Sequence, residues 1–329
     1  MRTFWYYETD STEMANNWLP FSDIGCEILE EAFKTKDEEI ELDDYVVNLK
    51  ENILIKKENK SKQYRIKRVE NVSRTEMIRH GRFCDYEPLT NRSFKESDNK
   101  GDYRGFIWSW YEKQNESGVV SLPTIIEKAA VGIQIEGKLC RKSHEANWLT
   151  NRLLQVKHQK EDIVGKCCIM LYTRECFLYS TINLALRADD QTKFDTLGPF
   201  CYLLKFVGLL TLYPDYMYEQ IVYRSMNLNL DQIEQYKKAA IDGDLKQWLC
   251  FSSTTKSRRV AKFYGGNSLF IIELPINEYS FGIDISKFSI IPEEEEVLLP
   301  TQICFRVKKV DYDESKKMHI IHLNMNMYS

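Results

Sequence analysis

A change of hydrophobic period along the second half of the chain constrains the fold most. From Asn147 onward the apolar residues recur at helical spacing, as at Leu178, Ile182 and Leu186 on one face. After about residue 220, short β-branched and apolar runs separated by turn residues predict strands instead. A block of helices followed by a block of strands predicts an α+β domain over 146–329, because a βαβ sheet would interleave the two.

The first 70 residues have a different pattern. Aromatic residues begin the chain at 4–7, and several short alternating runs surround one helical segment at 28–33. We therefore predict a small N-terminal α+β half-barrel wrapped on a helix over 1–70. Residues 71–145 are polar and give no clear pattern, so we assign them as a connecting region.

The composition excludes several classes of protein. With 329 residues and 43% hydrophobic content, the chain can bury two ordinary cores. A net charge of −4 provides no field that attracts nucleic acid or an anionic membrane, so we expect neither as a partner. The nine cysteines and five histidines show no zinc-ligand or catalytic-triad spacing, so we predict no metal site.

The chain shows no pattern for secretion or membrane insertion. Glu8 and Asp10 interrupt the N-terminus before any apolar run long enough for a signal peptide, and no C-terminal anchor pattern is present. The apolar runs fall short of the ~20 residues that cross a bilayer. We therefore expect a cytoplasmic or nuclear protein.

Three segments of the strand-rich region carry candidate chemistry. Arg224 ends an apolar strand, and Ser253, Thr254 and Thr255 form a hydroxyl cluster after Phe251. Four glutamates at 293–296 then run directly into the apolar sequence Val-Leu-Leu-Pro. Each segment alone is ordinary: a surface arginine, a helix cap or a solvated loop. Their occurrence together and in this order is much more specific.

This ordered set resembles the arginine–serine–glutamate class of ADP-ribosyltransferases, over about residues 145–325. The family's arginine is matched by Arg224, its Ser-Thr-Ser segment by 253–255, and its E-x-E motif by 294–296. Thr255 replaces the final serine, and Ser225 stands where glycine commonly follows the arginine. The resemblance implies NAD as co-substrate and a helical lobe followed by a split β-sandwich around the NAD cleft.

The resemblance also implies a role for each residue. Cleavage of the bond between nicotinamide and ribose develops positive charge on the sugar, which a carboxylate stabilises. Glu296 is expected to supply this carboxylate and to bind the ribose 2′-hydroxyl. Arg224 is expected to bind the pyrophosphate, because a planar guanidinium suits it. Ser253 is expected to hold Glu296 in its rotamer, while Ser225 and Thr254 complete the NAD site.

Three further side chains complete the expected site. Glu294 lies two residues before Glu296, so an extended segment would place both carboxylates on one face. Family members with E-x-E resemble arginine-specific enzymes, so Glu294 is expected to bind the acceptor arginine. Phe263, with Tyr264 as its competitor, matches a ring that packs on nicotinamide. Phe288 matches the aromatic residue of the acceptor loop.

The N-terminal pattern resembles a WWE domain over about residues 3–70, a family that binds poly-ADP-ribose or serves as a protein-interaction module. The resemblance is carried by Trp5, by Trp18 with the following Pro-Phe, by the segment 29–33 and by 45–49. Tyr7, Tyr45, Arg65 and Arg68 are the candidates for stacking on adenine and binding phosphate. Leu54 or Ile55 falls where a ligand-reading glutamine is often found.

These expectations combine into one hypothesis. The chain is expected to transfer ADP-ribose from NAD to an accessible arginine of an acceptor protein, with release of nicotinamide. Hydrolysis of NAD by water is the alternative enzymatic activity, and an inactive ADP-ribose reader or scaffold is the alternative of another class. The intact set of Arg224, Ser253 and Glu296 argues against an inactive protein.

Overall fold

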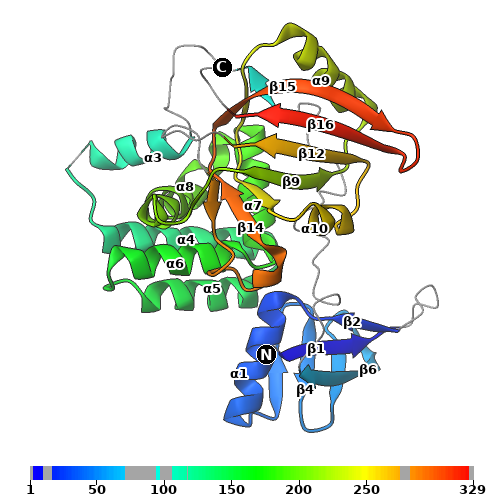
Figure 1. Ribbon diagram of the computed structural model, residues 1–329. Helices are drawn as coiled ribbons and strands as arrows, with labels where there is room; N and C mark the ends of the chain where they lie inside the picture. The colour runs from blue at the N-terminus through cyan, green and yellow to red at the C-terminus, as the bar shows by residue number, and fades with distance from the viewer. Residues whose placement is uncertain are drawn as a thin grey trace.

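The computed structural model describes residues 3–9, 17–70, 94–96, 106–116, 118–274 and 282–325. They form three parts: an N-terminal module, a helical lobe and a strand-rich half (Figure 1). The predicted α+β class is confirmed, with helices first and strands second in the C-terminal part.

The N-terminal module is an antiparallel sheet around one helix. Its strands lie in the order β2-β1-β6-β5-β4-β3. The helix, α1 (Asp23–Thr35), starts where the Ser22 hydroxyl accepts a hydrogen bond from the amide of Gly25 at 3.0 Å. Trp5, Leu29 and Leu54 are buried in its core. The strands are β1 (Thr3–Glu8), β2 (Trp18–Pro20), β3 (Glu39–Glu41), β4 (Tyr45–Asn48), β5 (Ile53–Lys56) and β6 (Asn59–Glu70).

The helical lobe extends further toward the N-terminus than the pattern at Asn147 indicated, because two of its helices lie before that residue. Gly132 of α4 lies so close to α8 that an added Cβ would come 1.8 Å from the Thr196 carbonyl oxygen, so these helices need a glycine to pack. The helices are α3 (Phe106–Asn115), α4 (Leu122–Leu139), α5 (Ser143–Gln155), α6 (Glu161–Tyr172), α7 (Phe177–Ala188), α8 (Phe194–Tyr202) and the π-helical turn η3 (Leu203–Leu209).

One segment of this lobe, Gln191–Leu212, is long and apolar enough to cross a membrane by length and composition. It belongs to the lobe's core, where 61% of its most apolar window is buried and where Phe200, Leu203 and Leu204 are inaccessible to solvent. A core helix of a folded domain passes the same test, so this segment is explained by its packing.

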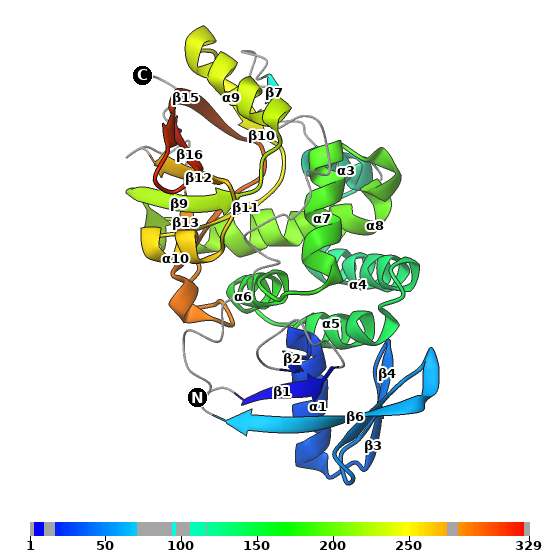
Figure 2. The same ribbon diagram turned by 90° about the vertical axis from the view of Figure 1, so that its right-hand side faces the viewer.

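The sheet of the strand-rich half is weakly paired between β9 and β11. The described strands follow the order β7-β10-β15-β16-β12-β9-β11-β14-β13-β8, and β9 pairs with β11 only where Tyr223 faces Thr255. Helix α9 (Leu230–Asp242) packs on β15 (Figure 2). The other elements are β7 (Lys95–Glu96), β8 (Met217–Tyr218), β9 (Ile221–Met226), β10 (Lys246–Trp248), β11 (Ser252–Thr255), α10 (Arg258–Phe263), β12 (Ser268–Glu273), β13 (Gly282–Asp284), β14 (Glu296–Leu299), β15 (Ile303–Asp313) and β16 (Met318–Asn324).

Where the N-terminal module meets the helical lobe, its carboxylates accept hydrogen bonds from backbone amides of the lobe. The Asp43 carboxylate accepts hydrogen bonds from the amides of His144 at 2.7 Å and Glu145 at 3.2 Å. These are first-turn amides of α5, whose own N-cap residue, Lys142, makes no side-chain cap. Asp23 likewise accepts from the amide of Glu175 at 2.8 Å. Carboxylates of one part therefore satisfy backbone donors of the other.

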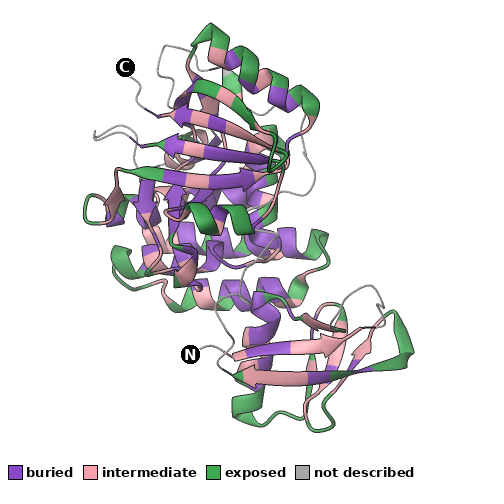
Figure 3. Ribbon diagram, turned by 45° about the vertical axis from the view of Figure 1, so that its right-hand side comes forward, coloured by how far each residue is buried: buried purple, intermediate pink, exposed green. Residues whose placement is uncertain are grey.

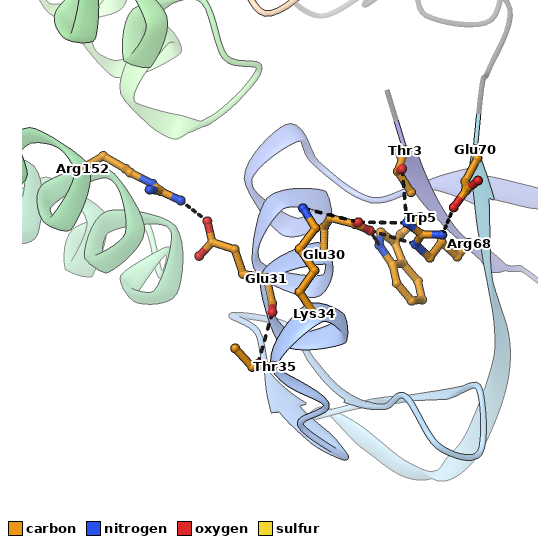
Figure 4. A network of polar contacts seen from close by, with 9 residues as sticks. All are labelled: Thr3, Trp5, Glu30, Glu31, Lys34, Thr35, Arg68, Glu70 and Arg152. Atoms are coloured by element: carbon orange, nitrogen blue, oxygen red, sulfur yellow. Dashed lines mark hydrogen bonds and ion pairs between the residues drawn. The ribbon is translucent and has the colours of Figure 1, made fainter. Parts of the chain in front are cut away.

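Charged side chains of α1 strengthen this contact, as Figure 4 shows for Glu31 and Arg152. Figure 3 shows that α1 also carries buried residues where it approaches the lobe. The Arg174 guanidinium lies 4.5 Å from the Trp148 ring centroid and bonds to Glu27 at 3.1 Å. Arg152 pairs with Glu31, which also accepts from the Trp148 indole at 3.3 Å. Acidic residues of the module thus face basic and aromatic residues of the lobe, and the two parts are joined by specific contacts.

Replacing Asp43 with alanine is expected to lower the stability of the whole chain. The change leaves two α5 amides without their cap, a loss of about 1 kcal/mol for a typical N-cap. The melting temperature, measured by scanning calorimetry, should fall by about 2–4 °C. Asp44→Ala is the matched control, because its exposed ion pair with Lys142 contributes little. Equal shifts for both variants would contradict the capping role.

Candidate active site

Three neighbouring strands bring the predicted site residues together. Arg224 lies on β9, Ser253 on β11 and Glu296 at the start of β14, and these strands are adjacent in the sheet (Figure 1). The three side chains are 3%, 0% and 0% exposed, respectively. The Arg224 Nη1 atom donates a hydrogen bond to the Ser253 carbonyl oxygen at 2.6 Å. The guanidinium is therefore fixed against the strand that carries the hydroxyl cluster.

The register between β11 and β14 shows which hydroxyls share a face with Glu296. Thr255 lies directly opposite Glu296, and Ser253 lies opposite Leu298. Residues opposite one another project to the same face, and the period of two adds Ser253 to the face of Thr255. Leu298 belongs to the core of the helical lobe, so this face is turned toward that lobe.

Thr254 lies on the other face of β11. Its hydroxyl donates a hydrogen bond to the Val297 carbonyl oxygen at 2.7 Å, and Val297 belongs to the core of the sheet. Thr254, predicted in the NAD site, is thus placed in the sheet core, whereas Thr255, not predicted, is the direct cross-strand neighbour of Glu296. The strand period applied to 252–255 would have found it.

The predicted extended shape of the E-x-E segment is wrong. Glu294 ends a 3₁₀ turn, Pro292–Glu294, and Glu295 adopts the left-handed conformation with φ of 48°. The strand begins only at Glu296. The period-two reasoning for Glu294 therefore does not apply, because the residue between the two glutamates is not extended. Glu294 is buried, at 2% exposed, while Glu295 is exposed.

Ser225 follows Arg224 in β9 and is fully buried. Its hydroxyl oxygen makes no hydrogen bond with the described part of the chain. A buried hydroxyl without a partner costs free energy. A ligand group that forms a hydrogen bond with the Ser225 hydroxyl would remove this cost.

The two aromatic residues predicted for the site, Phe263 and Phe288, lie in different surroundings. Phe263, at the end of α10, is 47% exposed, whereas its competitor Tyr264 is 1% exposed. The Phe288 ring packs edge-on against Tyr216, with centroids 5.0 Å apart. Phe263 thus lies partly at the surface, and Phe288 packs on Tyr216 in the segment that connects the helical lobe to β8.

The sequence does not predict the ion pair that lies beside β11. The Lys256 ammonium lies 2.8 Å from the Asp284 carboxylate, and the Lys256 amide donates to the Glu295 carbonyl oxygen at 3.1 Å. Burial alone would raise the pKa of Asp284, but hydrogen bonds from Lys256 and Ser286 outweigh it and hold this pKa below its usual value. The pair joins β11 to β13 across the left-handed residue Glu295.

The candidate residues of the N-terminal module separate into two groups. The rings of Tyr7 and Tyr45 lie 5.5 Å apart. Arg65 bonds to Glu8 at 2.7 Å, whereas Arg68 pairs with Glu30 at 2.9 Å and with Glu70. Figure 4 shows Arg68 between these two glutamates, beside Trp5. The structure therefore brings the tyrosines together and holds both arginines in ion pairs with other residues.

Within the described ranges, no group of three His, Cys, Asp or Glu side chains could hold a metal ion. The site on β9, β11 and β14 consists of a guanidinium, hydroxyls and a carboxylate, all of them buried. This arrangement can bind a phosphorylated ligand and stabilise positive charge beside it.

The chain has structural neighbours at low sequence identity. A search of curated proteins found no match. Among solved structures, the type III effector XopAI of Xanthomonas axonopodis pv. citri is 15% identical, with a TM-score of 0.48 over 66% of this chain and 95% of that one. The ADP-ribosyltransferase HopU1 of Pseudomonas syringae pv. tomato is 18% identical, with a TM-score of 0.43 over 70% and 98% of the two chains.

Family models match both parts of the chain. The model described as WWE domain matches residues 3–68, which form the N-terminal module. The model described as NAD:arginine ADP-ribosyltransferase matches residues 152–327, more than half of the chain, and this range holds Arg224, Ser253 and Glu296. The chain therefore belongs to the NAD:arginine ADP-ribosyltransferase family and carries a WWE domain at its N-terminal end.

Proposed function

We propose that this mono-ADP-ribosyltransferase directs its activity at arginine and transfers ADP-ribose from NAD to an arginine side chain of an acceptor protein. The observation that carries the proposal is the buried Glu296 carboxylate, which shares a strand face with Ser253 and Thr255, together with the Arg224 guanidinium, which bonds to the backbone of Ser253 on the strand between them. These are the groups that cleavage of a nicotinamide–ribose bond requires in one place.

In the proposed reaction, the bond between the nicotinamide nitrogen and the ribose carbon breaks, and its electrons leave with nicotinamide. Positive charge then develops on the ribose, and the Glu296 carboxylate stabilises it while accepting a hydrogen bond from the 2′-hydroxyl. The side chain is 0% exposed, which strengthens this electrostatic effect because water screens it little. Thr255 and Ser253 keep the carboxylate in position from the neighbouring strand.

Arg224 and Ser225 are proposed to hold the other end of NAD. A guanidinium carries five N–H donors in a planar fork, which binds a pyrophosphate at two points. The buried Ser225 hydroxyl makes no hydrogen bond in the described part of the chain, so it can bind the nicotinamide amide. The serine at this position thereby adds a polar group that glycine would lack.

Glu294 is proposed to receive the acceptor. Its carboxylate pairs with the incoming guanidinium and takes one proton as a guanidinium nitrogen bonds to the ribose carbon. The exposed left-handed Glu295 separates it from Glu296, so the two carboxylates belong to different local structures and can serve different steps. The released nicotinamide and the proton on Glu294 balance the reaction.

Glu294→Gln is expected to reduce transfer to poly-arginine by at least ~100-fold while hydrolysis of NAD stays measurable, because the variant removes the base but leaves Glu296 in place. The measurement uses radiolabelled NAD, with label on poly-arginine and free ADP-ribose quantified in parallel. Glu295→Gln is the matched control, since its exposed side chain belongs to the same acidic run. Loss of hydrolysis together with transfer would contradict the role given to Glu294.

The choice of acceptor is tested in the same assay with poly-arginine, poly-lysine and a cysteine- and asparagine-containing peptide. The proposal predicts label on poly-arginine and stability of the product to conditions that cleave carboxylate esters. Efficient transfer to the other acceptors, with none to poly-arginine, would overturn the arginine assignment. Release of free ADP-ribose at the same rate with and without every acceptor would instead identify an NAD glycohydrolase.

A further inference from the structure

The backbone at the start of β14 is held from both of its neighbouring strands, β11 and β13. The amide of Lys256, the residue after β11, donates a hydrogen bond to the Glu295 carbonyl oxygen at 3.1 Å. The amide of Ile285, the residue after β13, donates to the Glu296 carbonyl oxygen at 3.0 Å. The segment that carries the candidate carboxylates is therefore bonded on its two sides.

An ion pair between the same two strands crosses this segment. The Lys256 ammonium lies 2.8 Å from the Asp284 carboxylate. Asp284 lies opposite Val297 in the sheet, so it projects to the face of Val297 and away from the face of Glu296. The pair thus crosses β14 on the side of the sheet away from the Glu296 carboxylate, where it can support the strand without contacting the ribose.

Both members of the pair are held by further contacts. One oxygen of Asp284, Oδ1, accepts hydrogen bonds from the amide and the hydroxyl of Ser286, at 3.1 and 2.5 Å, which leaves Oδ2 for Lys256. The Lys256 ammonium also lies 5.8 Å from the ring centroid of Tyr218, on β8 beside β13. The side chains of Lys256 and Asp284 are only 24% and 27% exposed, so salt and water screen their attraction less than they screen a surface pair.

The segment held in this way has a strained turn at its centre. Glu295 has a φ of 48°, a conformation that costs free energy for a residue with a side chain. If Glu295 relaxed to an extended conformation, the chain direction before it would change, and the buried Glu294 side chain would move relative to Glu296. Contacts on Glu295 therefore decide how the two carboxylates lie relative to one another.

From these contacts we infer that Lys256 and Asp284 are positioning residues for the transfer step. Their ion pair holds the turn at Glu295, so that the Glu294 carboxylate meets the guanidinium of the acceptor while Glu296 faces the ribose. The pair thereby favours an arginine side chain over water as the acceptor of ADP-ribose. No bond of the reaction forms or breaks on either residue. The inference rests on the function proposed above for Glu294 and adds two residues that control it.

Lys256→Met and Asp284→Asn each remove one charge of the pair at nearly constant size. We expect each variant to lower the ratio of ADP-ribose transferred to agmatine to ADP-ribose released into water by at least ~10-fold, because a displaced carboxylate no longer lies at the acceptor. The rate of NAD hydrolysis and the KM for NAD should change by less than ~3-fold, because the groups that cleave NAD keep their place. Radiolabelled NAD measures both products in one assay.

Three further variants show whether the charge pair is responsible. Lys256→Arg keeps the positive charge and should retain a ratio within ~3-fold of the wild-type value. The double variant Lys256→Met/Asp284→Asn should be no worse than the more impaired single variant, since the effects of residues that act through one contact do not add. Lys309→Met is the matched control: it breaks a lysine–aspartate pair with Asp311 at 2.7 Å on β15, outside β11, β13 and β14, and should leave the ratio unchanged.

Hydrogen exchange without any substrate tests the turn itself. In Lys256→Met, the amides of 294–296 are expected to exchange at least ~10-fold faster than in the wild-type protein, while peptides from β12 and β16 exchange at wild-type rates. This readout does not depend on the acceptor. A wild-type chain that modifies no guanidinium would refute the proposed function, and the exchange result would still show whether the pair holds the turn.

Three outcomes would overturn the inference. The first is an unchanged ratio of transfer to hydrolysis in both single variants, which would mean that the pair has no influence on the acceptor. The second is an equal loss of transfer and hydrolysis together with a lower melting temperature, which would show that the pair only stabilises the fold. The third is unchanged exchange at 294–296 in Lys256→Met, which would show that other contacts hold the turn.

Discussion

Glu296→Gln should abolish both transfer of ADP-ribose and hydrolysis of NAD, with a loss of at least about 10²–10³-fold in kcat. The substitution keeps the size of the side chain and one acceptor oxygen, replaces the other oxygen by an NH2 donor, and removes the negative charge that stabilises the developing oxocarbenium ion. Because Glu296 is fully buried, no solvent group can take over that charge. Both reactions pass through the same cleavage step, so both should fall together.

The matched measurement is the affinity for NAD, determined by titration with the same variant. We expect it to change by less than ~10-fold, because the carboxylate acts mainly in the transition state. Thr255→Val provides a comparison on the neighbouring strand: it retains the β-branched shape and removes the hydroxyl of the residue opposite Glu296, which accepts a hydrogen bond from the Ser257 amide at 3.1 Å. A Glu296→Gln enzyme with normal transfer would mean that another group carries the charge.

Arg224→Lys should have the second largest effect. Lysine keeps the positive charge but lacks the planar fork, so its ammonium cannot hold a pyrophosphate at two points while bonding to the Ser253 carbonyl oxygen as Arg224 does. We expect the KM for NAD to rise at least ~10-fold through weaker binding. A buried acceptor left without its partner should also lower the free energy of unfolding by about 1–3 kcal/mol.

Steady-state kinetics and chemical denaturation of the same preparation measure these two effects. Arg306→Lys on β15 is the control, because this arginine is partly exposed and lies outside the strands of the site. An Arg224→Lys enzyme with an unchanged KM would show that the guanidinium is purely structural. Unchanged stability with a raised KM would show that the Arg224 guanidinium contributes to NAD binding and not to folding.

The site could be predicted from the sequence where its chemistry follows from short segments. Arg224, Ser253 and Glu296 were assigned because their three segments occur in the order of a known family pattern, and the structure places them on three adjacent strands. Thr255 was missed because its neighbour Thr254 was preferred, although alternation along β11 distinguishes their faces.

Other features could not be deduced from local pattern. The left-handed Glu295 has no glycine or asparagine to signal it, so four consecutive glutamates appeared to form one extended segment. The docking of the WWE domain depends on Asp43 and the amides of α5, which are about a hundred positions apart in the chain. No periodicity links such partners.

A crystal structure with NAD bound to the Glu296→Gln variant tests the central claim most directly. The account predicts that residue 296 lies within about 3 Å of the 2′-hydroxyl of the nicotinamide ribose. It also predicts the pyrophosphate on Arg224 and the nicotinamide amide beside Ser225. NAD bound away from β9, β11 and β14, or with its nicotinamide ribose turned from residue 296, would contradict the account.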